Sequence, residues 1–470
     1  MDSHQTQQYL ESFINHEIHL DQARSSAFKL ERVQRLLKNL GDPQDHLKVI
    51  HVAGTKGKGS ICALTANILK ESNYRVGLYT SPHINDMRER IRILAKAPMN
   101  SNSGDIFPDM ISNRELADVL GEIKPLIEQS KIEEEIGRLS FFEVFTALAL
   151  YYFRQQKVDF VVLETGLGGR LDATNAAPSL IAVIAPISLE HTHILGNTIS
   201  DITKEKAAII KERKQNVIIS PQDDQAKEIL KNRCSQFDID PVWTSEQAKS
   251  TLISQSVNGQ VIDLSTEQME YKRLELPLLG AHQRDNCAAA VSIVECLKES
   301  GYVISPDAIR NGTKGVFWPL RFEIINNEPL VVLDGAHTTA SVRALAGLMK
   351  EIFNHKRTTL VFGVSKDKDK EPILSELKKI TENIIFTKAD HPRAADLPGA
   401  LSVQKALDLA RQKSEPNDII LVTGSIFVVS EARAIIEEMK RVASAPLPRF
   451  PVDFLGDAGA PVTGDHHFLG

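Results

Sequence analysis

The first part of the chain alternates between short continuous apolar runs and longer segments with helical spacing. Five apolar runs have the length and composition of buried strands, at residues 49–52, 76–79, 160–163, 181–187 and 217–219. Helical spacing lies between some of them, most clearly at residues 141–154 and 202–213, and it also covers about residues 7–40 near the start. Because strands that alternate with helices are typical of a parallel sheet covered by helices, the pattern predicts an α/β domain.

Two segments interrupt this alternation of strand and helix patterns and mark the boundaries between parts of the chain. Short strand patterns at residues 251–278, with a turn signal at Asn258-Gly259, predict a small antiparallel insertion. Glycines and Trp318-Pro319 within residues 312–320 predict a hinge, after which a second series of strand and helix patterns begins. The strand patterns of this second series are at residues 330–334, 360–363, 384–387 and 419–423.

The resulting fold class is α/β with two domains of unequal size. The first, residues 1–311, is predicted to hold a P-loop-type parallel sheet flanked by helices, with the small antiparallel insertion. The second, residues 321–443, is predicted to be a smaller Rossmann-like α/β domain. Residues 444–470 are rich in Pro and Gly without periodicity and predict a loose tail, while the polar residues 99–113 predict a surface loop.

The strongest chemical signal follows the first strand pattern, in the sequence Gly54-Thr-Lys-Gly-Lys-Gly-Ser60. Glycines at this place let backbone N–H groups approach an anion, and the start of a helix adds a positive dipole end. Lys58 is expected to reach the terminal phosphates of a nucleotide, and the Ser60 hydroxyl is expected to bind Mg²⁺. The spacing differs from the standard phosphate loop, because only Thr55 and Lys56 separate Gly54 from Gly57 and Gly59 follows Lys58.

Composition and charge narrow the class further. The chain has 470 residues and a net charge of −6, which disfavours a nucleic-acid-binding protein. Four cysteines, Cys62, Cys234, Cys287 and Cys296, form no C-x-x-C pair and predict buried thiols in a reducing compartment. The polar N-terminus shows no signal-peptide core, and no apolar run approaches the length of a membrane span. These features predict a cytoplasmic protein with no membrane partner.

Three further residues stand where strand or helix patterns meet loops. Glu164 ends a strand pattern beside the glycines of residues 166–169, whose spacing does not fit a dinucleotide-binding fingerprint. A carboxylate at such an edge suits a hard cation, so we interpret Glu164 as a magnesium ligand, against the alternative of a solvated turn residue. His191 follows another strand pattern and Lys206 lies on a helical one, where a satisfied histidine and an exposed lysine are the ordinary alternatives.

Taken together, the motifs resemble the folylpolyglutamate synthases and dihydrofolate synthases of the Mur ligase superfamily. The resemblance covers roughly residues 28–440 and includes the phosphate loop, the loop from Glu164 to Asn175, His191 and Lys206. The remaining motifs are Tyr79-Thr-Ser-Pro-His83, Gly280-Ala-His-Gln-Arg-Asp-Asn286, Trp318-Pro-Leu-Arg321, Leu333-Asp-Gly-Ala-His337, Phe362-Gly-Val-Ser-Lys-Asp-Lys-Asp369, His391-Pro-Arg-Ala394 and Val422-Thr-Gly-Ser425.

The resemblance implies an ATP-dependent ligase that joins L-glutamate to dihydropteroate and to reduced folates through an acyl phosphate. It implies ATP and two Mg²⁺ ions as cofactors, and a monomer. The implied ATP contacts are Gly54, Thr55, Lys56, Gly57, Lys58, Gly59, Ser60, Asn286, Arg321 and Asp334. The implied metal ligands are Ser60, Ser81, Glu164, His191 and a carbamylated Lys206.

The resemblance also implies where the other substrates bind. Ser140, Phe142 and Asp172 match the part that recognises the pterin ring, which favours a bifunctional enzyme, and His337 and Ser425 would bind glutamate. The implied catalytic residues are Lys58, His191, Lys206 and Arg321.

Some positions depart from the usual residues of the family. Lys56 replaces an asparagine, Glu190 stands where aspartate is common, Leu320 replaces a glycine, and Thr338-Thr339 replace Asn-Pro.

Three alternatives stay open at this point. The first two are a monofunctional folylpolyglutamate synthase and another Mur-type ligase. The third is a nucleotide-binding switch protein, for which Thr387-Lys-Ala-Asp390 resembles a guanine-binding motif. The spacing of the phosphate loop argues against that class.

Overall fold

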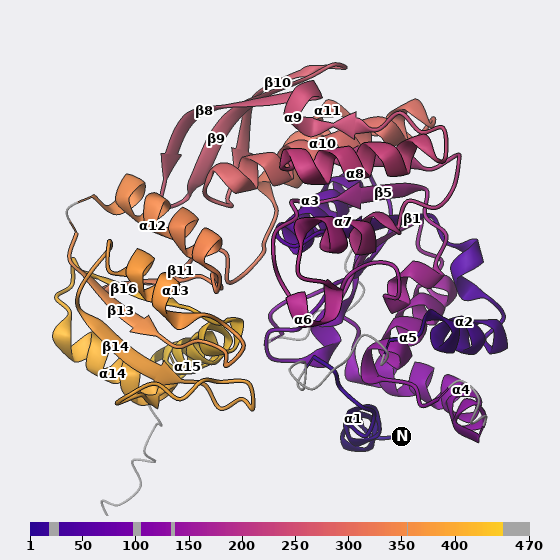
Figure 1. The fold of residues 1–470 in the computed structure, drawn as a ribbon. Coiled ribbons are helices and arrows are strands. Elements are labelled where there is room, and N and C mark those ends of the chain that lie inside the picture. The colour runs from indigo at the N-terminus through magenta and orange to yellow at the C-terminus, as the bar shows by residue number, and fades with distance from the viewer. Residues whose placement is uncertain (18–27, 97–104, 133–136, 355, 445–470) are drawn as a thin grey trace, which may run out of the picture.

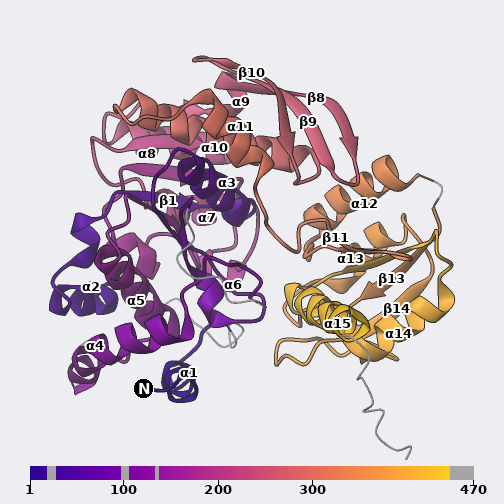
Figure 2. The same cartoon turned by 180° about the vertical axis from the view of Figure 1, so that it is seen from behind.

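The computed structural model describes residues 1–17, 28–96, 105–132, 137–354 and 356–444. Two α/β domains lie side by side, and a three-stranded sheet extends from the first domain over the second (Figure 1). The view from behind shows the same separation into two bodies (Figure 2). The predicted fold class is therefore confirmed, including the antiparallel insertion.

The sheet of the first domain has seven strands in the order β3-β2-β4-β1-β5-β6-β7. All neighbours are parallel except β3, which pairs antiparallel with β2 at the edge. The strands are β1 (Val49–Ala53), β2 (Val76–Tyr79), β3 (Ile91–Leu94), β4 (Phe160–Glu164), β5 (Ile181–Ile184), β6 (Asn216–Ile219) and β7 (Val242–Trp243).

Both faces of this sheet are covered, which explains the continuous apolar runs in the sequence. Successive side chains of a strand point to opposite faces, so Ile50 and Val52 pack into one core while Val49 packs into the other. The helices of this domain are α1 (Ser3–Glu11), α2 (Leu30–Asn39), α3 (Lys58–Glu71), α4 (Asn113–Ile132), α5 (Phe141–Gln155), α6 (Thr192–Leu195), α7 (Ile199–Ala207), α8 (Asp224–Ser235), α9 (Thr244–Gln247), α10 (Ala281–Glu299) and α11 (Pro306–Lys314).

The antiparallel insertion consists of β8 (Ala248–Ser256), β9 (Gly259–Thr266) and β10 (Glu270–Leu276). Its inner residues, among them Ile262 and Leu274, join the core formed with α3 and α10. At its other end Gln255 donates a 2.9 Å hydrogen bond to Glu351 of the second domain.

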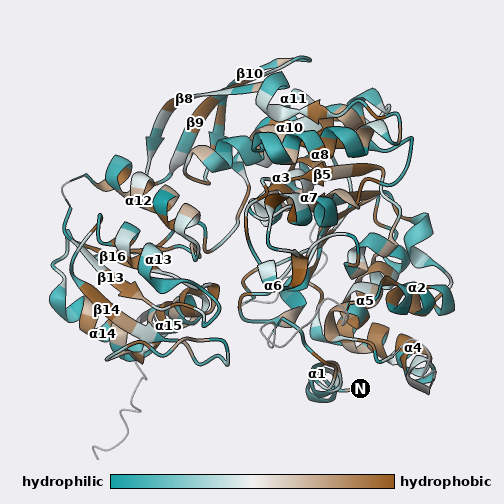
Figure 3. Cartoon of the chain, viewed as in Figure 1, coloured by the Kyte–Doolittle hydropathy of each residue, from teal (hydrophilic) through white to brown (hydrophobic). Residues whose placement is uncertain are grey.

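The second domain has a six-stranded sheet in the order β11-β12-β16-β13-β14-β15, parallel except at β11. Hydrophobic residues follow the strands of both sheets, as in β5 and β13, and the helices around them carry both hydrophilic and hydrophobic residues (Figure 3). Its strands are β11 (Glu323–Asn327), β12 (Leu330–Leu333), β13 (Thr358–Phe362), β14 (Ile384–Lys388), β15 (Leu401–Ser402) and β16 (Ile419–Thr423), and its helices are α12 (Thr339–Phe353), α13 (Lys370–Leu377), α14 (Val403–Lys413) and α15 (Ile426–Ser444).

Several boundaries differ from the sequence-based predictions. The helix predicted over about residues 7–40 is not continuous, because α1 ends at Glu11 and Ile14 forms a β-bridge with Ser140. The strand predicted at residues 181–187 ends at Ile184, because the Pro186 carbonyl turns to accept hydrogen bonds from Thr55 and Lys56.

The helix predicted at residues 202–213 is also wrong in extent. It runs from Ile199 to Ala207, and beyond it Lys211 donates to the carbonyl oxygens of Asn175 and Ala177. Helix α11 continues to Lys314, within the segment predicted as a hinge. Part of the predicted loop 99–113 and nearly all of the tail 444–470 lie outside the described residues.

Candidate active site

The glycine-rich loop connects β1 to α3 and is held against the loop that follows β5. The backbone N–H groups of Thr55 and Lys56 donate to the Pro186 carbonyl at 2.9 and 3.2 Å. Gly57 caps α3 with φ of +86°, a conformation that favours glycine. Lys58 and Ser60 therefore lie in the first turn of the helix, with backbone N–H groups available for an anion.

The glycines of this loop are also required by close packing. A Cβ atom on Gly57 would lie 2.4 Å from Oδ1 of Asn286, and one on Gly59 would lie 2.7 Å from the ring of Trp318. Asn286, on α10, donates from its amide nitrogen to Gln283 at 3.0 Å. The predicted ATP contact Asn286 is thus adjacent to the phosphate loop, and Trp318 covers the start of α3.

Glu164 ends β4 directly beside this loop. Its Oε1 lies 3.8 Å from Nζ of Lys58, and its Oε2 accepts a 3.2 Å hydrogen bond from the backbone N–H of Ser81. Burial raises the pKa of Glu164, while the positive charge of Lys58 acts in the opposite direction. The carboxylate accepts few hydrogen bonds from the described residues, so this oxygen donor fits a hard cation shared with a phosphate.

Lys206 is buried beneath the phosphate loop. Its Nζ donates a 2.8 Å hydrogen bond to the carbonyl oxygen of Gly54. Burial, with a further contribution from Lys58, lowers the pKa of Lys206 to about 7. A substantial neutral fraction near neutral pH is the form that carbamylation requires, because CO₂ reacts with an unprotonated amine.

His191 is the N-cap residue of α6 and has a φ of +51°. Among the described residues its buried Nδ1 has no hydrogen-bond partner. Burial lowers the pKa of His191 to about 3, so the ring is neutral and its nitrogen can donate a lone pair to a metal. The described part of the chain holds no cluster of three or more His, Cys, Asp or Glu side chains that could bind a metal ion.

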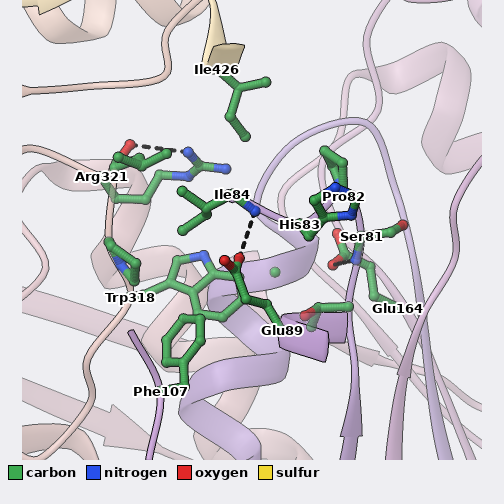
Figure 4. A pocket seen from close by; sticks show the side chains of 14 residues that line it. Ser81, Pro82, His83, Ile84, Glu89, Phe107, Glu164, Trp318, Arg321 and Ile426 are labelled. Carbon is green, nitrogen blue, oxygen red and sulfur yellow. Dashed lines mark hydrogen bonds between the residues drawn. The ribbon is translucent and has the colours of Figure 1, made fainter. Parts of the chain in front are cut away.

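Arg321 reaches this site from the connection to the second domain. It lines a pocket together with Ser81, Glu164 and Trp318, and Ile426 of α15 closes the far side (Figure 4). Its guanidinium donates to the Leu320 carbonyl at 3.0 Å. The pocket thus joins residues of both domains.

Two neighbours of Arg321 fix its loop. Asp334 accepts hydrogen bonds from the backbone N–H groups of Phe322 and Ala336 at 2.9 and 2.8 Å, and its burial raises its pKa. Leu320, where the family usually has glycine, adopts φ of +61°, a conformation that costs a non-glycine residue about 1 kcal/mol or more. Its side chain is buried in the core of the second domain, which offsets that cost.

Of the three residues implied in pterin recognition, Phe142 and Asp172 lie at the loop after β4, and Ser140 lies at the start of α5. Ser140 caps α5 and accepts a 3.3 Å hydrogen bond from the backbone N–H of Glu143. The ring of Phe142 leaves no room for a side chain at Gly166, where a Cβ atom would lie 2.6 Å from its Cζ. Asp172 is buried, and its oxygens accept hydrogen bonds from its own loop, including the N–H of Leu167 at 2.7 Å.

The two residues implied in glutamate binding follow neighbouring strands of the second domain. Ser425 comes after β16 and its hydroxyl lies 3.4 Å from that of Ser365. His337 comes after β12, and its Nδ1 lies 2.7 Å from the carbonyl oxygen of Gly335. Its Nε2 faces the first domain, 3.2 Å from Oε1 of Glu190 and 3.3 Å from Nζ of Lys56.

Some residues of the site were not predicted from the sequence. Glu190 and Lys368 were known only as parts of motifs, yet they form a 3.7 Å ion pair across the domain junction. Trp318 was assigned to a hinge and not to the site that it covers. The sequence signal that could have identified them is their place within motifs: Glu190 is next to His191, Lys368 is next to Asp369, and Trp318 shares a motif with Arg321.

Comparisons with known proteins identify the family of the chain. The model of the Mur ligase middle domain matches residues 133–294, and that of the Mur ligase glutamate ligase domain matches residues 320–426. The dihydrofolate synthase/folylpolyglutamate synthase of Bacillus subtilis (strain 168) is 34% identical over 419 residues, covering 86% of this chain and 94% of that protein. The folylpolyglutamate synthase of Lacticaseibacillus casei is 31% identical over 415 residues, covering 86% of this chain and 93% of that protein.

Solved structures give the same result. The apo form of L. casei FPGS superposes with a TM-score of 0.82 at 28% identity, covering 93% of this chain and all of that chain (100%). A structure named FPGS-AMPPCP-folate complex has a TM-score of 0.81 at 29% identity, with the same coverage of 93% and 100%. The chain therefore belongs to the dihydrofolate synthase/folylpolyglutamate synthase family of Mur ligases.

Proposed function

We propose that this enzyme uses ATP to join L-glutamate to the carboxylate of dihydropteroate and to the terminal carboxylate of reduced folates. The observation that carries the proposal is the pocket between the domains. It brings the end of β4 with Glu164, the start of α3 and Arg321 of the connecting segment to one place. A site shared by two domains can activate one substrate and then admit another while water is excluded.

The proposed reaction has two steps that conserve all atoms. A carboxylate oxygen of the folate substrate attacks the γ-phosphorus of ATP, and ADP leaves, which gives an acyl phosphate. The amine of L-glutamate then attacks the acyl carbon, an amide forms, and phosphate leaves with one former carboxylate oxygen. Lys58 and Arg321 are proposed to hold the transferring phosphate, since this chemistry depends mainly on positioning and charge neutralisation.

The metal sites are part of the proposal. Ser60, Ser81 and Glu164 would hold one Mg²⁺, and His191 with a carbamylated Lys206 would hold a second. Bound Mg²⁺ would neutralise charge on the phosphate oxygens during transfer. The buried Nδ1 of His191, which has no hydrogen-bond partner in the described ranges, and the lowered pKa of Lys206 support these assignments.

The other substrate contacts are proposed from the same geometry. Phe142 is proposed to stack on a pterin ring; its position against Gly166, in the loop whose N–H groups donate to Asp172, supports this. His337 and Ser425 follow adjacent strands of the second domain, and Nε2 of His337 faces the first domain; both residues are proposed to bind L-glutamate. Asn286 and Asp334 complete the ATP contacts.

We also propose a cytoplasmic monomer. The four cysteines are unpaired and buried, which supports a reducing compartment. Within the described ranges, none of the helices has the length and apolar character needed to cross a membrane.

The test is ADP release by the purified protein with ATP, Mg²⁺ and L-glutamate, with either dihydropteroate or a reduced folate added. Release with both substrates is expected for the bifunctional enzyme. Release with reduced folate alone would support a monofunctional folylpolyglutamate synthase, the name of the L. casei relative. Release with neither would overturn the proposed substrate class, and uridine-linked muramyl substrates would then be tried.

A further inference from the structure

Among the described residues, the carboxylate of Glu190 in the first domain pairs with two lysines, one of them from the second domain, and also lies against the neutral ring of His337 from the second domain. Oε1 of Glu190 lies 2.9 Å from Nζ of Lys56, 3.2 Å from Nε2 of His337 and 3.7 Å from Nζ of Lys368. The Glu190 side chain is only 10% exposed, so these contacts are partly shielded from solvent. Contacts of this kind are stronger than exposed surface ion pairs.

The partners of Glu190 come from both domains. Lys56 belongs to the phosphate loop, and Glu190 follows β5 in the same domain, so these two contact each other within one body. His337 follows β12 and Lys368 follows β13 of the second domain. Lys56 and Glu190 are also two of the positions at which this chain departs from the residues more common in its family.

The ring of His337 is held at both nitrogens. Its Nδ1 contacts the Gly335 carbonyl at 2.7 Å, an arrangement in which Nδ1 carries the proton and donates. Its Nε2 then accepts from Nζ of Lys56 at 3.3 Å, while Lys56 also donates to Glu190. The partner of Nδ1, Gly335, belongs to the second domain, and the partner of Nε2, Lys56, belongs to the first.

The charges at this junction depend on Glu190. Without its negative charge, Lys56 and Lys368 would face each other across the junction with no carboxylate between them. Lys368 would keep its 3.1 Å ion pair with Asp367, so the charge that loses its compensation is that of Lys56, and the ionic contact between the two domains would be lost.

We propose that Glu190 is a positioning residue that fixes His337 of the second domain against Lys56 of the phosphate loop and thereby sets the affinity for L-glutamate. The inference rests on the proposed role of His337 in glutamate binding. It assigns no contact with substrate to Glu190, which acts through Lys56, His337 and Lys368.

The test uses the full-length Glu190→Gln variant, which keeps the size of the side chain and removes its charge. KM for L-glutamate should rise about tenfold, while KM for ATP and the Mg²⁺ requirement change less than about threefold. Glu190→Asp, which keeps the charge on a shorter side chain, should fall between the wild type and Glu190→Gln. In the Lys56→Asn/Glu190→Gln double variant the two effects should not add, because both substitutions break one cluster.

The matched control is Glu376→Gln, which breaks ion pairs with Arg343 and Lys379 inside the second domain and should leave KM for L-glutamate unchanged. An unchanged KM in Glu190→Gln, or equal changes in KM for ATP, L-glutamate and Mg²⁺, would overturn the inference. Equal changes in all three would indicate that Glu190 acts on the neighbouring His191, the proposed metal ligand, and not on His337.

Small-angle X-ray scattering gives a readout that needs no activity. The radius of gyration of Glu190→Gln should exceed that of the wild type and of Glu376→Gln, because the two domains separate more easily. Equal values would contradict the positioning role. This result is independent of the proposed function. If the wild-type protein had no turnover on any folate, the proposed function would fail, yet the difference in radius of gyration between Glu190→Gln and the wild type could still be observed.

Discussion

The two α/β domains carry their functional groups in different ways. In the first domain, Glu164, His191 and Lys206 are buried or nearly so, and their pKa values are shifted mainly by burial. In the second domain, His337 keeps about a third of its side chain exposed (32%) and reaches toward partners of the first domain, although burial lowers its pKa as well. In the proposed mechanism, the first domain would hold the groups of phosphoryl transfer ready before substrates bind, while the second domain would position a substrate and depend on how the domains meet.

The largest effect is expected from Lys58→Ala in the first domain. Loss of the cation beside Glu164 should lower kcat about a thousandfold, because the transferring phosphate loses charge neutralisation in the transition state. Steady-state ADP release measures it. Lys70→Ala, at the far end of the same helix, is the matched control and should behave as wild type. Near-normal turnover of Lys58→Ala would contradict the assignment of the phosphate loop.

The next effect is expected from Lys206→Ala, which should lower kcat about a hundredfold, with partial rescue by added acetate or formate. In the wild type, a pKa of about 7 for Lys206 means that the neutral fraction of its amine increases as the pH rises through 7. Wild-type enzyme that has lost its CO₂ should therefore be reactivated more strongly by bicarbonate at higher pH. The control is Lys204→Ala, an exposed residue on the same helix. Full activity of Lys206→Ala would contradict the hypothesis that Lys206 is carbamylated.

A smaller effect, of another kind, is expected in the second domain. His337→Ala should raise KM for L-glutamate about tenfold and reduce kcat far less than Lys58→Ala does, because the residue positions a substrate and does not neutralise the transferring phosphate. Full kinetics with each substrate varied in turn would show the split. A fall in kcat as large as that of Lys58→Ala would remove the contrast between the domains.

The smallest effect is expected from Ser140→Ala. Its hydroxyl caps α5, so the loss should reduce the free energy of unfolding by about 1 kcal/mol. Urea-induced unfolding measures this change. Asp223→Ala, which removes the equivalent cap of α8, provides a comparison of the same kind away from the pterin site. If Ser140→Ala instead raises KM for dihydropteroate without loss of stability, the residue binds substrate directly.

The sequence predicted most of the fold because most strands are buried on both faces. The runs at β1 and β16 are continuous and apolar for that reason, and their places were predicted within one residue. Strand β3 was missed because Arg92 interrupts its apolar run, and β11, at the edge of its sheet, because three of its five residues are polar. Helix ends were least predictable, as in α7, where side-chain contacts of Lys211 with a distant loop decide the path.

The site was predictable in its residues and less so in their contacts. Glu164 and Lys58 belong to motifs at strand ends, and parallel strands bring such ends together. The contact of Lys56 with His337 joins residues separated by 281 positions in two domains, and no local pattern contains that information. Asp172 appears in a motif, but only the structure shows that its oxygens accept hydrogen bonds from its own loop.

The most direct test of the central claim follows the oxygen atoms of the carboxylate. Dihydropteroate with a heavy-oxygen-labelled carboxylate would be incubated with the enzyme, ATP, Mg²⁺ and L-glutamate, and the products analysed by mass spectrometry. The account predicts one glutamyl product per ADP, with one labelled oxygen in the released phosphate. Label in AMP, or ADP release with no label in phosphate, would contradict an acyl-phosphate ligase.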